Sequence, residues 1–239
     1  MFQKKQYWYK VYVRHISMSN PKIFYHGDST AIIKFGDKID EDINILVHKF
    51  LESLVRGFSE YSSILDIYPT YNSIIIDYDP NKILYENIKE KINLINSEFD
   101  SSDNEKKHYK IIEIPVKYGG EFGPDLKRMS KALNITEKKI IQIHSSQKYR
   151  VHMIGFMPGF PYLGGLDKRI SFPRLDEPRL AVPEGSVGIA GDQTGIYPFS
   201  SPGGWNIIGR TNLKLFDSKK NPPNLIISGS YIKFKIQND

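Results

Sequence analysis

The sequence contains no cysteine. Disulfides and thiolate chemistry are therefore excluded, and so is a secreted scaffold stapled by disulfides. No run approaches the roughly 18 apolar residues that a membrane helix needs. The opening residues, MFQKKQYWYK, have no apolar stretch behind their basic residues, so they do not read as a secretory signal. We therefore expect a cytosolic protein with no membrane partner.

The familiar catalytic signatures are also missing. The sequence has no GxxxxGK[ST] phosphate loop, no GxGxxG after a strand, no HExxH and no GxSxG. An ATP or nicotinamide site of a common kind is therefore not encoded. None of the six histidines has a short zinc-ligand spacing to another histidine, so we expect no metal site.

Composition indicates a soluble globular protein, since 40% of the 239 residues are hydrophobic and 25% are charged. The net charge of +6 is uneven. Residues 1–108 have 14 Lys and Arg against 16 Asp and Glu, whereas residues 109–239 have 19 against 11. The basic charges are scattered, which favours a solvated surface over nucleic-acid binding. An anionic substrate or partner is the alternative.

Glycine and proline divide the chain into two regions. Residues 1–108 hold 3 glycines and 3 prolines, and residues 109–239 hold 15 and 11. The polar run NSEFDSSDNEKKHYK separates the two. The shift predicts a small domain over residues 1–100, a linker over 101–110 and a second domain over 111–239.

The first region has the pattern of a small α+β domain. Strands are predicted near Tyr9–Ile16 and over Thr30–Gly36, and a further pair over residues 63–79. Apolar residues at three- and four-residue steps predict helices over 40–58 and 81–95. The order strand, helix, two strands, helix, strand is typical of a ferredoxin-like sandwich, which hosts many functions.

The second region combines short helices with many short strands. A strand is predicted over residues 111–120, followed by helices over 123–134 and 136–146. Further strand-like segments separated by Gly/Pro turns lie at 148–156, 186–191, 212–217 and 231–236. This pattern favours a β-barrel or a β-sandwich.

The run GFMPGFPYLGG, residues 155–165, is a poor helix and a poor strand, because glycine and proline weaken both. We expect an ordered loop there. Its aromatic residues, among them Phe160 and Tyr162, are candidates for the wall of a binding pocket.

The segment from Gly155 to Thr211 is the richest in candidate binding residues. Arg174, Arg179 and Arg210 are candidate catalytic residues, because an arginine fork binds a carboxylate or a phosphate. The other predicted substrate-binding residues are small, polar or aromatic: Ser186, Gln193, Tyr197, Ser201, Gly203, Gly204, Trp205 and Thr211. In the alternative interpretation, Gly and Pro only shape barrel corners, and Tyr197 and Trp205 belong to the core.

Two further residues are candidate catalytic groups. Glu121 lies four residues before Asp125, and both frame the start of a predicted helix. They either stabilise the helix end or hold a proton or an amine. His144 is a candidate acid, base or hydrogen-bond donor, although a lone histidine is more often structural or exposed.

Five ordered blocks carry a family resemblance: VKYGGEFGPDL, GFMPGFPYLGGLD, PRLDEPRLAVPEGSVGIAG, QTGIYPFSSPGGWNIIGRT and LFD. They resemble the KipI and allophanate hydrolase subunit 1 family, which includes the B subunit of the bacterial ATP-dependent 5-oxoprolinase. The resemblance is dense from about Val116 to Asp217. It implies an N-terminal small α/β domain followed by a cyclophilin-like β-barrel.

The resemblance also implies a function. The chain would be the B subunit of a complex that opens 5-oxo-L-proline to L-glutamate with ATP hydrolysis, and it would be inactive alone. Its partners would be the C subunit, which resembles allophanate hydrolase subunit 2, and the A subunit, with ATP at a site shared with them. Two alternatives share the same blocks: an inhibitor that binds a sporulation histidine kinase, and a subunit in urea or allophanate metabolism.

Overall fold

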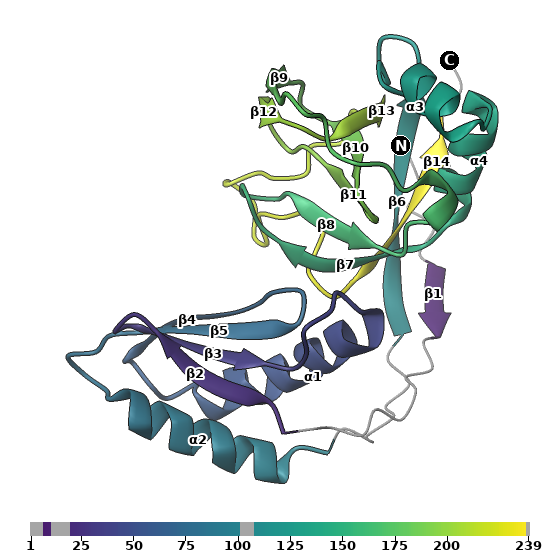
Figure 1. The fold of residues 1–239 in the computed structure, drawn as a ribbon. Helices are drawn as coiled ribbons and strands as arrows, with labels where there is room; N and C mark the ends of the chain where they lie inside the picture. Colours follow the sequence, from purple (N-terminus) through teal and green to yellow (C-terminus); the bar gives the residue numbers. More distant parts are fainter. Residues whose placement is uncertain (1–6, 11–19, 101–107, 238–239) are drawn as a thin grey trace. The chain divides into compact units, whose positions relative to one another are not determined.

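A ring of strands organises the C-terminal part of the computed structural model, which describes residues 7–10, 20–100 and 108–237 (Figure 1). The strand β6 is long enough to pair antiparallel with β13 and in parallel with β14, which closes the ring. Around the ring the strands are β6 (His108–Tyr118), β13 (Asn206–Arg210), β10 (Ser186–Ala190), β11 (Gln193–Ile196), β8 (Pro161–Gly164), β7 (Tyr149–Ile154) and β14 (Tyr231–Ile236). Of the two predicted architectures, the barrel is the one formed.

Alternating apolar side chains fill the barrel. Ile114 and Val116 of β6, Ile189 of β10 and Phe234 of β14 are fully buried in one cluster. Two helices belong to the same unit, α3 (Leu126–Leu133) and α4 (Glu137–Ser146), and a 3₁₀ turn, η1, covers Lys168–Ile170. The Oγ1 atom of Thr136 accepts a hydrogen bond from the Lys139 amide and so caps the start of α4.

A two-stranded ribbon and a second apolar cluster lie outside the ring. The ribbon pairs β9 (Arg179–Val182) with β12 (Ser201–Gly203). Buried side chains from the ribbon, the barrel strands and their connections form the cluster: Phe160, Val182, Ala190, Tyr197, Trp205 and Ile207. This cluster attaches the ribbon to the barrel.

The small unit is a four-stranded antiparallel sheet with two helices. The sheet order is β2 (Lys22–His26), β3 (Thr30–Lys34), β5 (Ser73–Tyr78) and β4 (Ile64–Pro69). The helices α1 (Glu41–Gly57) and α2 (Tyr85–Glu98) supply buried apolar residues to the same core as β3 and β5. The side chain of Asp40 accepts hydrogen bonds from the amides of Asp42 and Ile43, which fixes the start of α1.

The strand order of this unit differs from the predicted one. The strand β2 was not predicted, and the first strand after α2 is β6, which belongs to the barrel. The small unit therefore runs strand, strand, helix, two strands, helix. The β2 sequence, KIFYH, has three apolar or aromatic residues in a row, so it lacks the alternation of apolar and polar residues that identifies a strand.

Contacts divide the chain into two compact units, Lys10–Lys107 and Met1–Tyr9 together with His108–Asp239. The strand predicted near Tyr9–Ile16 lies mostly outside the described residues, and β1 (Tyr7–Lys10) pairs with β6. Most of the linker predicted over 101–110 also lies outside them, and β6 already begins at His108. Among the described residues, no helix has the length and apolar character to span a membrane.

Two local predictions on the barrel were wrong. Residues 212–217 form no strand and contribute only an isolated bridge between Phe216 and Asn224. The run 155–165 is a loop only at its start, because Pro161–Gly164 form β8. Pro161 takes the first position of that strand, which tolerates the missing amide proton.

The segment between β6 and α3 lies against β13. The Gly119 amide donates to the Ile208 carbonyl at 3.1 Å, and the Asp125 amide donates to the Ile207 carbonyl at 3.0 Å. A Cβ at Gly123 would overlap with the Ile208 carbonyl, and the contact is with backbone, which cannot swing away. Only glycine therefore allows this close approach.

Replacing Gly123 by alanine should destabilise the barrel by about 1–3 kcal/mol, the usual cost of overpacking. Urea unfolding followed by tryptophan fluorescence measures this, since Trp8 and Trp205 both belong to the barrel unit. Gly204→Ala is the control, because a Cβ there meets neighbours only at 3.6 Å or more. Equal unfolding midpoints for the two variants would contradict the close packing.

Candidate functional site

Arg179 is held by a buried carboxylate. The Nη2 atom of Arg179 donates to Oδ1 of Asp125 at 2.7 Å, and the Ile207 amide donates to Oδ2 of Asp125 at 2.6 Å. Asp125 is 4% exposed, so both of its oxygens have partners inside the protein. The predicted catalytic residue Arg179 therefore joins the ribbon to the start of α3 and to β13.

Arg128 and Asn206 extend this network, and sequence reasoning missed both. Nη2 of Arg128 donates to Oδ1 of Asn206, and the Arg128 guanidinium lies over the Phe172 ring, 5.1 Å from its centroid. The side-chain amide of Asn206 donates to the carbonyls of Pro173 at 2.7 Å and Ile189 at 3.0 Å. The network fixes the segment after η1 on the barrel. The one sequence signal was the three-residue step from Asp125 to Arg128 on a helix.

A groove of about 470 Å³ opens beside this segment. Its lining combines two arginines with apolar and acidic residues: Arg128, Phe172, Pro173, Arg174, Leu175, Asp176 and Glu177. We call it the arginine groove. Arg174 is exposed, and no carboxylate among the described residues forms an ion pair with it. Of the three predicted arginines, Arg174 is therefore the one presented at a groove.

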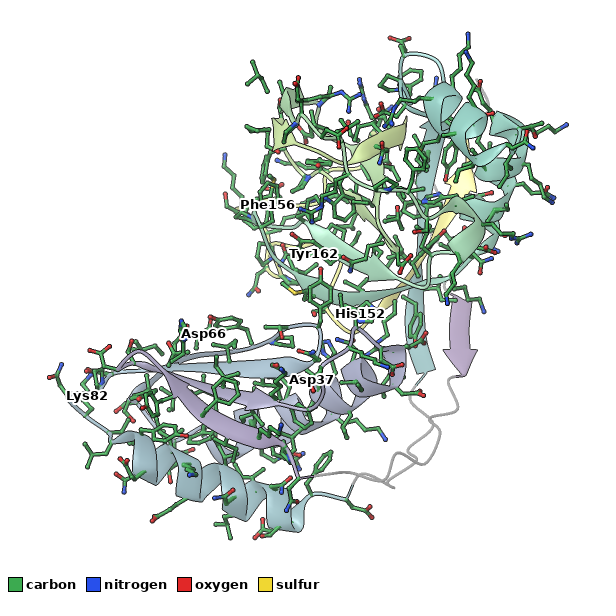
Figure 2. All side chains as sticks on the ribbon, in the orientation of Figure 1. Asp37, Asp66, Lys82, His152, Phe156 and Tyr162 are labelled. Carbon is green, nitrogen blue, oxygen red and sulfur yellow. The ribbon has the colours of Figure 1, made fainter. Side chains whose placement is uncertain are left out.

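Two tyrosines lie within the electrostatic reach of Arg174. Burial raises the pKa of both the Tyr162 and Tyr197 hydroxyls, and the positive charge of Arg174 partly opposes the shift. Tyr162 is half-buried, whereas Tyr197 is buried. Both hydroxyls stay protonated near neutral pH, where a phenol can donate a hydrogen bond. Figure 2 shows Tyr162 and the 64% exposed Phe156 on the side of the barrel formed by β7 and β8.

The predicted aromatic residues form a packed cluster. The Phe160 ring lies 4.9 Å from Tyr162, 5.2 Å from Tyr197 and 5.4 Å from Trp205, measured between centroids. These rings fit because Gly188 and Gly195 face each other across β10 and β11, and a Cβ on either would press on Trp205. Phe160, Tyr197 and Trp205 are buried, which favours the core interpretation for them.

The ribbon glycines shape the site. A Cβ at Gly203 would overlap with the Tyr197 hydroxyl, and the Gly204 carbonyl accepts a hydrogen bond from the Leu175 amide at 2.8 Å. Ser201 pairs with Val182 in the ribbon. These three residues thus hold the aromatic cluster and the groove wall in place.

A second group of predicted residues lies at the other end of β13. Arg210 pairs with Ser186 of β10, and the Thr211 amide donates to the Gly185 carbonyl. Arg179 contacts the Trp205 carbonyl just before β13, so the two arginines lie at opposite ends of this strand. The other two predicted residues are Glu121, exposed in the segment after β6, and Gln193, at the start of β11. The sequence-predicted site is therefore divided into two places.

His144 lies in the barrel core. Its Nδ1 atom is 2.8 Å from the Tyr118 hydroxyl and its Nε2 atom is 3.0 Å from the Thr194 hydroxyl. Thr194 donates its own proton to the Gly188 carbonyl, so it must accept from Nε2–H, and Tyr118 then donates to Nδ1. The ring has no exposed surface and stacks on Phe234 at 4.4 Å. These contacts give His144 a structural role and offer no support for the predicted catalytic one.

The described residues contain no group of three His, Asp or Glu side chains that would hold a metal ion. A larger groove of about 650 Å³ lies on the small unit along α2, but none of the predicted site residues lines it. We therefore place the candidate site on the barrel unit.

Burial lowers the pKa of His144 to about 3, well below its ordinary value. Between pH 6.5 and 3, His144 binds a proton in the unfolded chain but not in the folded chain. The free energy of unfolding therefore falls as pH falls, by about 1.4 kcal/mol per pH unit. From pH 7 to 5, His144→Gln should therefore lose about 2 kcal/mol less stability than the unchanged protein.

Urea unfolding at the two pH values measures this difference, with His26→Gln, at an exposed histidine, as the control. An unchanged pH dependence in His144→Gln would show that the ring titrates normally.

Comparison with known proteins gives this site a family context. Residues 21–226 match the family model described as carboxyltransferase domain, subdomain C and D. The chain is 41% identical over 220 residues to the 5-oxoprolinase B subunit of Bacillus subtilis (strain 168), covering 87% of this chain and 89% of that relative. It is 34% identical over 223 residues to the 5-oxoprolinase B subunit of Escherichia coli O157:H7, covering 93% and 99%.

Solved structures agree on the fold. The crystal structure of TTHA0988 superposes with a TM-score of 0.76 at 30% identity, covering 88% of this chain, and this chain spans only 40% of that one. The Kluyveromyces lactis urea amidolyase matches with a TM-score of 0.73 at 20% identity over 91% of this chain and 15% of its own. The latter likeness shows the fold alone. Because the family model and both curated relatives span most of it, the chain belongs to the carboxyltransferase subdomain C and D family that includes the 5-oxoprolinase B subunits.

Proposed function

We propose that this protein is the B subunit of an ATP-dependent 5-oxoprolinase, which converts 5-oxo-L-proline to L-glutamate. The observation that carries the proposal is the 41% identity to a 5-oxoprolinase B subunit over 89% of that relative's length. A match over nearly the whole length relates this chain to a complete subunit, whereas a match to one part of a larger enzyme relates it only to one domain.

The substrate's chemistry fits the arginine groove. 5-Oxoproline carries a carboxylate, and opening its lactam requires stabilising negative charge that develops on the lactam carbonyl oxygen. Arg174 is exposed at the groove without an ion-pair partner among the described residues, and we assign it the substrate carboxylate. The protonated Tyr162 hydroxyl is the adjacent neutral donor. Arg179 acts as a positioning residue, because Asp125 already neutralises it.

The reaction needs more than this chain supplies. The sequence has no common nucleotide motif, so in this proposal ATP binds at a site that the A and C subunits complete, and the chain is inactive alone. A cytosolic location follows, since ATP is the co-substrate. The fold names implied by the family resemblance, ferredoxin-like for the small unit and cyclophilin-like for the barrel, belong to the same proposal.

The two alternative functions have weaker support. No described feature points to a histidine kinase as partner. For urea metabolism, the likeness to urea amidolyase is at 20% identity and involves 15% of that chain. The oxoprolinase function is therefore preferred over both.

The complex of this chain with its A and C subunits should produce glutamate only when both ATP and 5-oxoproline are present. Arg174→Gln should lower the rate at subsaturating 5-oxoproline at least about tenfold, which is about 1.4 kcal/mol. Arg169→Gln is the matched control, because Arg169 is another exposed barrel arginine but is paired with Asp167 at 2.6 Å.

Two outcomes would contradict separate parts of the proposal. Absence of glutamate from a folded and verified complex of all three proteins would refute the oxoprolinase function. An unchanged rate in Arg174→Gln, with normal assembly, would refute only the assignment of the carboxylate to the arginine groove.

A further inference from the structure

Three polar residues lie side by side on adjacent strands, away from the arginine groove. Lys117 of β6 is the register partner of Arg210 of β13, and Arg210 is the register partner of Ser186 of β10. Register partners point to the same face of a sheet, with Cβ atoms about 4.5–5.5 Å apart. We call Lys117, Arg210 and Ser186 the β13 row.

The row brings two positive charges together. The Lys117 ammonium lies 5.4 Å from the Phe122 ring centroid, and the Arg210 guanidinium lies 5.7 Å from the same centroid. Like charges directly opposite each other across a sheet are unfavourable. The shared aromatic ring offsets part of that repulsion, and a bound anion would offset the rest.

Arg210 keeps unused hydrogen-bonding capacity. Its side chain is half-buried, and its Nε atom is buried without a hydrogen-bond partner among the described residues. No carboxylate among the described residues forms an ion pair with Arg210. Glu121, one residue before Phe122, is exposed and forms no such pair. The pairing that neutralises Arg179 is thus missing at Arg210.

Ser186 provides an independent sign of a ligand. Its side chain has no exposed surface, and its Oγ atom has no hydrogen-bond partner among the residues that the structure describes. A buried hydroxyl without a partner costs about 1–3 kcal/mol, so such groups usually have a role. The Arg210 side chain lies over the adjacent Gly185, where a Cβ would be 3.4 Å from Arg210 Cγ.

We propose that the β13 row is a binding site for a phosphate group. An arginine fork, a lysine ammonium and a serine hydroxyl donate from three neighbouring strands, which suits the several oxygens of a tetrahedral phosphate better than the two of a planar carboxylate. The phosphate is either free inorganic phosphate or part of a nucleotide. This inference is independent of the proposed function, since it requires only the anion.

Calorimetric titration of the full chain with inorganic phosphate, ADP and acetate tests the proposal. Phosphate should bind with a Kd near or below about 1 mM, and acetate at least about tenfold more weakly. Equal affinities for phosphate and ADP indicate free phosphate as the ligand, and ADP binding at least about tenfold tighter indicates a nucleotide. Either result supports the site.

Variants separate binding from folding. Arg210→Gln should weaken phosphate binding at least about tenfold, and Arg169→Gln should leave it unchanged. Ser186→Ala removes a buried hydroxyl that has no partner, so the variant should be at least as stable as the unchanged protein and yet bind phosphate several-fold more weakly.

Three results would overturn the proposal: no phosphate binding up to about 20 mM, acetate binding as tightly as phosphate, or unchanged phosphate affinity in Ser186→Ala. Because Ser186→Ala should remain folded, its phosphate affinity tests the proposal even if Arg210→Gln fails to fold.

Discussion

The carboxylate of Asp125 ties the outer elements of the barrel together. One oxygen accepts from the Ile207 amide of β13, and the other accepts from Arg179 of the ribbon. Removing either partner would leave a charged group with poor solvation, because Asp125 is buried. The segment before α3, the ribbon and β13 are therefore held in one arrangement, and the arginine groove lies beside it.

The ion pair with Asp125 also distinguishes Arg179 from the other two candidate arginines. Arg179 is neutralised inside the protein, whereas Arg174 and Arg210 have no ion-pair partner among the residues described by the structure. The unpaired arginines lie in different places, one at a groove and one on the β13 row. A carboxylate substrate and a phosphate would therefore contact separate parts of the barrel surface.

Local sequence patterns predict the elements whose causes are local. Helix α1 follows from its apolar spacing and from the Asp40 cap, and α4 follows from Thr136. Strands β8 and β13 were missed, because Gly and Pro obscure their alternation and their pairing partners lie elsewhere in the chain. Closure of the barrel depends on β6 pairing with the distant β14, which no local pattern encodes.

The candidate site was predictable as a set of residues but not as a geometry. The Gly/Pro blocks did mark the segment that holds Arg174, the aromatic cluster and Arg210. Which arginine is paired depends on Asp125, which lies 54 residues before Arg179. The setting of His144 was hidden for a similar reason, since its partner Thr194 is 50 residues away.

A double-mutant cycle between Asp125 and Arg179 tests most directly whether this ion pair holds the ribbon on the barrel. Urea unfolding of Asp125→Asn, Arg179→Gln and the double variant gives the coupling free energy between the two side chains. We expect a coupling of at least about 1 kcal/mol, because each single change leaves the other group without its partner in a largely buried setting. A coupling below about 0.3 kcal/mol, with the two single effects simply adding, would contradict it.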